Sequence, residues 1–113
     1  DELHRWHVSP ETVTMPGPGG ENLEDILRRA VPAVEAAAKR YEGDVLLASH
    51  DAVIKVLLCY WLGAPLASFF RFQVPNCSIT VIEVKEGSAP RMLLMGDAAH
   101  LGDSFERPEQ KGL

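Results

Sequence analysis

The chain has 113 residues, of which 46% are hydrophobic, and its formal net charge is −5. This length suits one domain with a modest core, and the apolar fraction excludes a disordered chain. The acidic balance argues against nucleic acid or an anionic membrane as the main partner, but it leaves room for a small anionic ligand at a local cluster of donors. The longest apolar stretch, residues 52–62, is too short to span a bilayer. The polar N-terminus does not read as a signal peptide, and two cysteines make a poor disulfide framework, so we expect a cytoplasmic protein.

Residues 1–21 predict a connector or loop, because three prolines and three glycines interrupt them. Within this segment, residues 1–7 also fit the end of a helix. A helix is expected to begin at Asn22, which is a good N-cap followed by acidic residues, and to end at Gly43. Its apolar residues follow helical spacing, and Pro32 inside it should kink the helix or remove one backbone hydrogen bond.

A strand and a second helix are expected next. Val45–Ala48 is a short continuous apolar run between turn signals, which predicts a strand covered on both faces, as in a parallel sheet. Such a strand needs neighbours on both sides, so we do not expect this chain to form a complete sheet on its own. Asp51–Leu62 predicts a buried helix that ends at Gly63. Asp51 and Lys55 are four residues apart and can pair on its one polar edge.

A short helix and a hairpin complete the expected elements. The short helix runs from Pro65 through Phe70. Residues 78–84 alternate and are rich in β-branched side chains, which predicts a strand, and residues 91–95 predict the returning strand of a hairpin. Residues 104–113 predict a frayed polar tail.

The candidate functional residue is His50, at the seam between the expected buried strand and the buried helix. Ligands of open α/β sheets bind beyond the carboxyl ends of the strands, and the free N–H groups at the start of a helix favour an anion. A histidine in this place can donate a hydrogen bond to a phosphoryl oxygen or exchange a proton near neutral pH. The local pattern alone leaves open that His50 simply caps the helix or binds a carbonyl group.

Four stretches of the sequence resemble the C-terminal half of the histidine phosphatase superfamily, the phosphoglycerate-mutase-like phosphatases. They occur in the family's order and at its spacing, over about residues 10–101. They look like the family's glycine-glutamate turn and helix, its strand with the second catalytic histidine and the helix behind it, the segment leading into the last strands, and the closing motif. The stretches are GGENLEDILRRAVPAV, VLLASHDAVIKVLLCYWLG, FFRFQVPNCSITVIEV and LMGDAAHL.

The resemblance implies an α/β fold in which residues 22–103 form part of a phosphoglycerate-mutase-like three-layer sheet with flanking helices. It implies an enzyme family that hydrolyses or transfers phosphoryl groups of small phosphomonoesters through a phosphohistidine. His50 corresponds to the second catalytic histidine, which stabilises the phosphoryl group in flight. Ser49, Asp51 and His100 are the candidates for contact with the substrate, and His100 equally fits a role in holding the C-terminus in place. We expect no cofactor and no metal; His4 and His7 are three residues apart, but no acidic or cysteine cluster completes a site.

The sequence departs from the family at the expected nucleophile, because it contains no Arg-His-Gly motif. The acidic proton donor of the family also precedes the matching region, and neither Glu2 nor Glu11 fits its pattern. Loss of a covalent nucleophile removes most of the catalysis, so we expect the isolated chain to be inactive or nearly so. Asp51 stands where the family most often has glycine, and it would repel a phosphate unless it turned toward Lys55, as we expect.

The resemblance also implies that a first strand, absent from this sequence, lies in the middle of the sheet beside the strand ending at Ser49. Open apolar edges tend to pair, so we expect a homodimer or a second chain that carries the N-terminal half. The alternative function is a non-catalytic module or truncated remnant that binds a partner or a phosphorylated ligand. The choice of substrate, and of mutase over phosphatase, stays open because loops outside this sequence select them.

Overall fold

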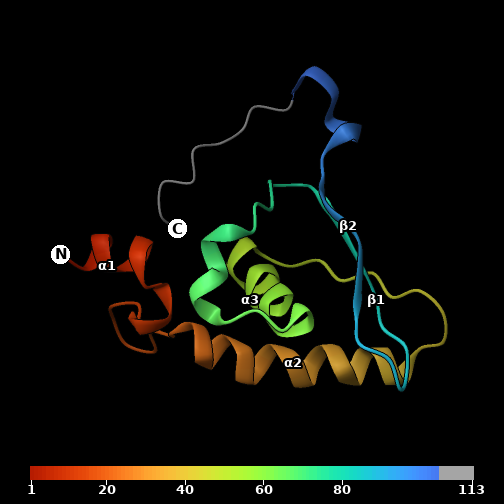
Figure 1. The fold of residues 1–113 in the computed structure, drawn as a ribbon, viewed down its shortest axis with the longest axis horizontal. Coiled ribbons are helices and arrows are strands. Elements are labelled where there is room, and N and C mark those ends of the chain that lie inside the picture. The colour runs from red at the N-terminus through yellow and green to blue at the C-terminus, as the bar shows by residue number, and fades with distance from the viewer. Residues whose placement is uncertain (105–113) are drawn as a thin grey trace.

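Two helices form the centre of the computed structural model, which describes residues 1–104. Helix α2 (Leu23–Arg40) packs against helix α3 (Asp51–Leu62), as Figure 1 shows. Strands β1 (Ile79–Glu83) and β2 (Arg91–Asp97) pair as an antiparallel hairpin, and β2 contacts α3. The fold is therefore a small α/β arrangement in which helices pack beside a two-stranded sheet.

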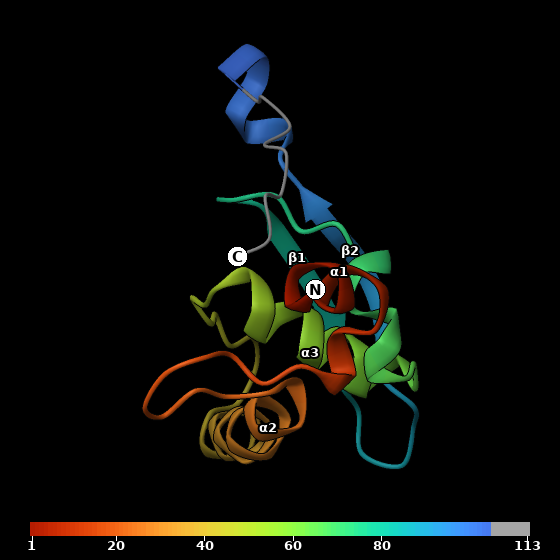
Figure 2. The same cartoon turned by 90° about the vertical axis from the view of Figure 1, so that its left-hand side faces the viewer.

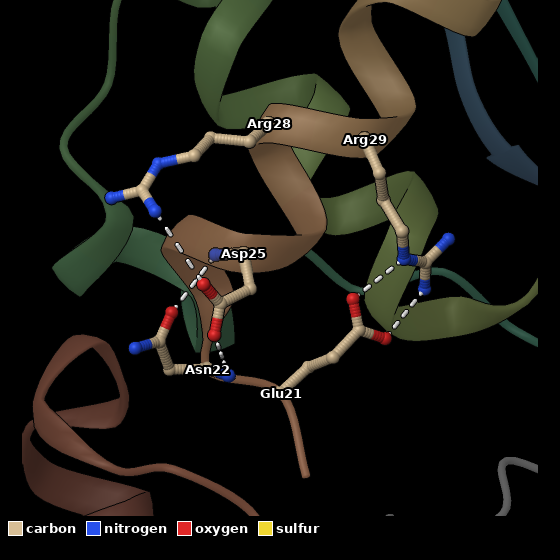
Figure 3. A network of polar contacts seen from close by, with 5 residues as sticks. All are labelled: Glu21, Asn22, Asp25, Arg28 and Arg29. Carbon is tan, nitrogen blue, oxygen red and sulfur yellow. Dashed lines mark hydrogen bonds and ion pairs between the residues drawn. The ribbon is translucent and has the colours of Figure 1, made fainter. Parts of the chain in front are cut away.

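Helix α2 begins where the sequence predicts. The Asn22 side chain accepts a hydrogen bond from the Asp25 backbone N–H at 2.8 Å, and the Asp25 carboxylate accepts one from the Asn22 backbone N–H at 3.0 Å (Figure 3). This reciprocal capping box satisfies two donors at the start of the helix. The helix ends at Arg40, slightly before the predicted stop at Gly43, and Pro32 lies inside it on the exposed side.

Helix α3 has the predicted bounds. It begins after His50 as N-cap and ends at Gly63, whose φ of 65° is the left-handed conformation that glycine adopts without a steric penalty. The Ala64 N–H closes this end on the Cys59 carbonyl at 2.9 Å. The middle of the helix is almost wholly buried, as its apolar sequence predicts.

The predicted strand at Val45–Ala48 is wrong for this structure. These residues form an exposed extended connection from α2 to α3 and pair with no strand in the described part of the chain (Figure 1). Leu46 is 95% exposed, and Val45 and Leu47 are also exposed. A strand exists only through hydrogen bonds to a neighbour, and an apolar pattern shows that a segment suits a sheet without supplying the neighbour.

The segment predicted as a connector contains helix α1 (Glu2–Val8) and a 3₁₀ turn, η1 (Pro10–Thr12). The structure thus has a helix in the first seven residues, but the helix begins here, with Asp1 as its N-cap, rather than being only the end of a longer one. The Trp6 ring packs on Phe69 and Phe70 with 5.4 Å between centroids in each pair. Through these contacts α1 is part of the core, whose buried cluster comprises Trp6, Val13, Leu23, Ala52, Val56 and Phe69.

Two further 3₁₀ segments flank the hairpin. Segment η2 (Leu66–Arg71) occupies the place of the predicted short helix and packs on α3. Segment η3 (Ala99–Ser104) follows β2 and projects away from the helices in both views (Figures 1 and 2). The predicted tail lies almost entirely outside the described residues. Over residues 1–104, no helix has the length and apolar character needed to cross a membrane.

Candidate functional site

His50 occupies the N-cap position of α3 with extended backbone angles, φ −105° and ψ 158°. Its carbonyl accepts the first helical hydrogen bond, from the Ile54 N–H at 3.0 Å. The side chain makes no capping hydrogen bond and is exposed to solvent. The structure therefore does not support the simple capping role that the local pattern left open, and the imidazole is available to a ligand.

The first turn of α3 supplies backbone donors beside this imidazole. An α-helix leaves its first N–H groups without intrahelical acceptors, and in α3 the internal bonds begin at Ile54. The partial positive charge of a helix start adds to these donors and favours an anion. A histidine and a set of free amides thus lie at one place, and both can donate hydrogen bonds to an anion such as a phosphoryl group.

Asp51 follows His50 directly, and its carboxylate turns toward Lys55 as expected. The distance between the Lys55 Nζ and the Asp51 Oδ2 is 3.1 Å, and the Lys55 side chain is fully buried. The ammonium also lies over the rings of Phe69 and Phe70, at 5.1 and 5.6 Å from their centroids. The spacing of Asp51 and Lys55 in the sequence predicted the ion pair. No signal in the sequence predicted the two aromatic rings next to the Lys55 ammonium.

The remaining residues predicted to contact the substrate are Ser49 and His100. Ser49 directly precedes His50 in the exposed connection between α2 and α3. His100 is exposed on η3, and this segment and α3 lie apart in both views (Figures 1 and 2). Ser49, His50 and Asp51 are neighbours because they are consecutive in the chain, and the Asp51 carboxylate turns away toward Lys55. His100 lies apart from all three (Figures 1 and 2).

Two other exposed histidines lie away from His50, on α1. His4 and His7 lie on the exposed face of α1, where the His7 ring stacks on Phe70 at 5.4 Å. Within residues 1–104, no group of three His, Cys, Asp or Glu side chains is suited to a metal ion. Burial raises the pKa of the Cys59 thiol, which disfavours the reactive thiolate.

Comparisons with known proteins identify the class. The sequence profile of the histidine phosphatase superfamily (branch 1) matches residues 1–98, and the chain belongs to this superfamily. The match begins upstream of the stretches quoted above and takes in α1, which is consistent with the place of that helix in the core.

Curated relatives include two enzymes named for phosphomonoester chemistry. The chain is 28% identical over 106 residues to phosphoserine phosphatase 1 of Hydrogenobacter thermophilus, which covers 93% of the chain and 49% of the relative. It is 31% identical over 108 residues to the probable phosphoglycerate mutase GpmB of an Enterobacter species. That match covers 89% of the chain and 50% of the relative. The chain thus spans about half the length of these relatives.

Solved structures show the same fold over the part that the chain covers. YhfR of Bacillus stearothermophilus matches with a TM-score of 0.68 and 31% identity, over 76% of this chain and 43% of that one. A mutant phosphoserine phosphatase from Entamoeba histolytica, solved in complex with phosphoserine, matches with a TM-score of 0.70 over 88% and 50%. At 21% identity, this second likeness bears on the fold alone.

Proposed function

We propose that the chain forms the C-terminal half of a histidine phosphatase domain that acts on small phosphomonoesters. In this proposal His50 is the second catalytic histidine, and the nucleophilic histidine belongs to an N-terminal half. The observation that carries the proposal is the position of His50. Its side chain is exposed, makes no capping hydrogen bond and lies beside the free amides of α3. The names of the phosphoserine phosphatase and phosphoglycerate mutase relatives support small phosphomonoesters as the substrate class.

In the proposed reaction, the ester P–O bond of the substrate breaks as an N–P bond forms on the nucleophilic histidine. The alcohol leaves with a proton from the acidic donor of the N-terminal half. Water then cleaves the N–P bond and releases inorganic phosphate. His50 and the first amides of α3 donate hydrogen bonds to the phosphoryl oxygens while negative charge is spread over them. Fixed donors of this kind stabilise the transition state because they need no reorganisation when the charge develops.

A second candidate is a module that binds a phosphorylated ligand without turnover. One feature of the sequence favours this candidate: the 113 residues contain no Arg-His-Gly motif. The site described above would then hold an anion but would lack the nucleophile for covalent chemistry. Turnover after addition of an N-terminal half separates the two candidates.

The test is hydrolysis of an aryl phosphate by the chain alone and by the chain mixed with the N-terminal half of the Bacillus stearothermophilus relative. We expect no turnover by the chain alone and turnover by the mixture. His50→Ala should lower the activity of the mixture at least about 100-fold, as loss of an oxyanion donor does. His4→Ala, which changes another exposed histidine, should leave it unchanged.

Two results would contradict the proposal. Turnover by the chain alone that survives His50→Ala would mean that another residue carries the reaction. An active mixture that tolerates His50→Ala would remove His50 from the catalytic site. A mixture that associates but stays inactive would favour the binding module.

A further inference from the structure

The buried ion pair of Asp51 and Lys55 lies one residue from the proposed catalytic histidine. The Lys55 side chain is fully buried, and 19% of the Asp51 side chain is exposed. Burying an ammonium group requires a large desolvation penalty, which a hydrophobic side chain of similar size would avoid. A buried pair at this position is therefore poorly explained by stability alone.

An acidic residue in the first turn of a helix can stabilise the helix start with its charge when its carboxylate lies near the free amides. The Asp51 carboxylate instead pairs with a residue one turn further along the helix. Here Oδ2 binds the Lys55 Nζ at 3.1 Å, on the core side of the helix. The other oxygen, Oδ1, is hidden from solvent, and no residue in the described part of the chain donates a hydrogen bond to it. Lys55 thus draws the carboxylate inward and neutralises its charge.

We propose that Lys55 is a positioning residue that withdraws the Asp51 carboxylate from the start of α3, so that the free amides beside His50 stay open to a phosphoryl group. This inference rests on the proposed function. The rings of Phe69 and Phe70 contribute by confining the ammonium to one location, 5.1 and 5.6 Å from their centroids. Without Lys55, an uncompensated carboxylate would compete with phosphate for the same donors.

The first measurement needs no ligand. Hydroxide-catalysed exchange of a free backbone amide slows when a negative charge lies nearby. We therefore expect Lys55→Met to slow exchange at the Ala52 and Val53 amides about threefold. The double variant Asp51→Asn/Lys55→Met should restore the wild-type rates because it removes the uncompensated charge. The matched control is Lys85→Met, which breaks a surface ion pair with Glu83 on the hairpin, 3.5 Å between Nζ and Oε1. It should change the exchange rate of neither amide.

The second measurement is binding of inorganic phosphate, followed by NMR shifts of the same two amides. Lys55→Met should weaken binding about tenfold, and the double variant should recover it. If Lys55→Met fails to fold, Lys55→Gln serves as the single variant, since it keeps a hydrogen-bond donor but removes the charge.

A purely structural role for Lys55 would give the opposite sign. In that case its loss would loosen the helix start and speed amide exchange in both the single and the double variant. Faster exchange in both variants would overturn the inference. Unchanged exchange rates would overturn it as well. A third outcome separates this inference from the proposed function. If the exchange rates change as expected but phosphate shifts no amide signal of the wild-type chain, the proposed phosphate site is refuted and the withdrawal of the carboxylate stands.

Discussion

At the scale of single residues, Glu21 and Arg29 form an ion pair held by two hydrogen bonds. The Arg29 guanidinium donates two hydrogen bonds to the Glu21 carboxylate, at 2.6 and 3.0 Å (Figure 3). The hydrogen bonds lower the pKa of Glu21 and raise the pKa of Arg29. Both side chains are exposed enough for water and salt to screen the pair, so its effect on stability is small.

The pair predicts a pH-dependent contribution to stability. Because the pKa of Glu21 is lower in the folded state, the contribution is present above the unfolded pKa and is lost as pH falls through the folded one. Arg29→Met should therefore slightly lower the free energy of unfolding near neutral pH and have no effect in acid, where Glu21 is protonated. Urea unfolding at both pH values measures this. A deficit that persists in acid would show that Arg29 acts through packing of its stem instead.

At the scale of elements, α1 places one buried side chain, Trp6, in the core. Trp6 is 5% exposed, whereas the other residues of α1 are exposed. Its ring packs on both Phe69 and Phe70 of η2. Its Nε1–H is buried and makes no hydrogen bond within the described residues, so the indole contributes through its apolar area.

Trp6 predicts a graded effect of substitution on stability. Trp6→Ala should lower the free energy of unfolding by about 3–5 kcal/mol, because it removes a large buried ring and leaves a cavity. Trp6→Phe should cost less than about 1.5 kcal/mol, because it keeps an aromatic ring and removes a buried donor that has no acceptor. Chemical unfolding of the three proteins measures the difference. Equal losses in the two variants would contradict this account, because they would mean that a phenyl ring recovers none of the packing of the indole.

At the scale of the whole molecule, the apolar connection between α2 and α3 pairs with no strand within residues 1–104. Leu46 is 95% exposed, and the hairpin also presents exposed apolar residues, including Val81 and Leu93. An extended apolar segment with unpaired backbone groups tends to join another strand. We propose that it joins a sheet completed by a second copy of the chain or by an N-terminal half.

This proposal predicts association that depends on Leu46. Sedimentation of the wild-type chain should show mass that rises with concentration, and Leu46→Lys should shift it toward the monomer. Leu3→Lys places the same charge at another exposed leucine, on α1, and is the control. If the wild-type chain stays monomeric and also fails to bind the N-terminal half of a related phosphatase, the proposal of sheet completion fails.

Local signals in the sequence predicted much of the fold. Asn22 as N-cap and Gly63 as C-cap mark helix ends that the structure reproduces, because both act through contacts within a few residues. The hairpin followed from its alternating pattern for the same reason. The place of His50 between an apolar run and a helix was also visible, since chain order alone sets it.

The amino-acid sequence by itself determined the start of α2, both ends of α3, the hairpin and the position of His50, because each depends on neighbours along the chain. The superfamily was also visible in the sequence, through the order and spacing of its motifs. Tertiary structure alone decided three further features. Val45–Ala48 suits a strand, but its state depends on a partner that comes from elsewhere. The burial of Trp6 depends on η2, about sixty residues away, and no local pattern encodes that contact. The aromatic surroundings of Lys55 likewise arise from packing between α3 and η2, because a cation meets distant rings only once the chain has folded.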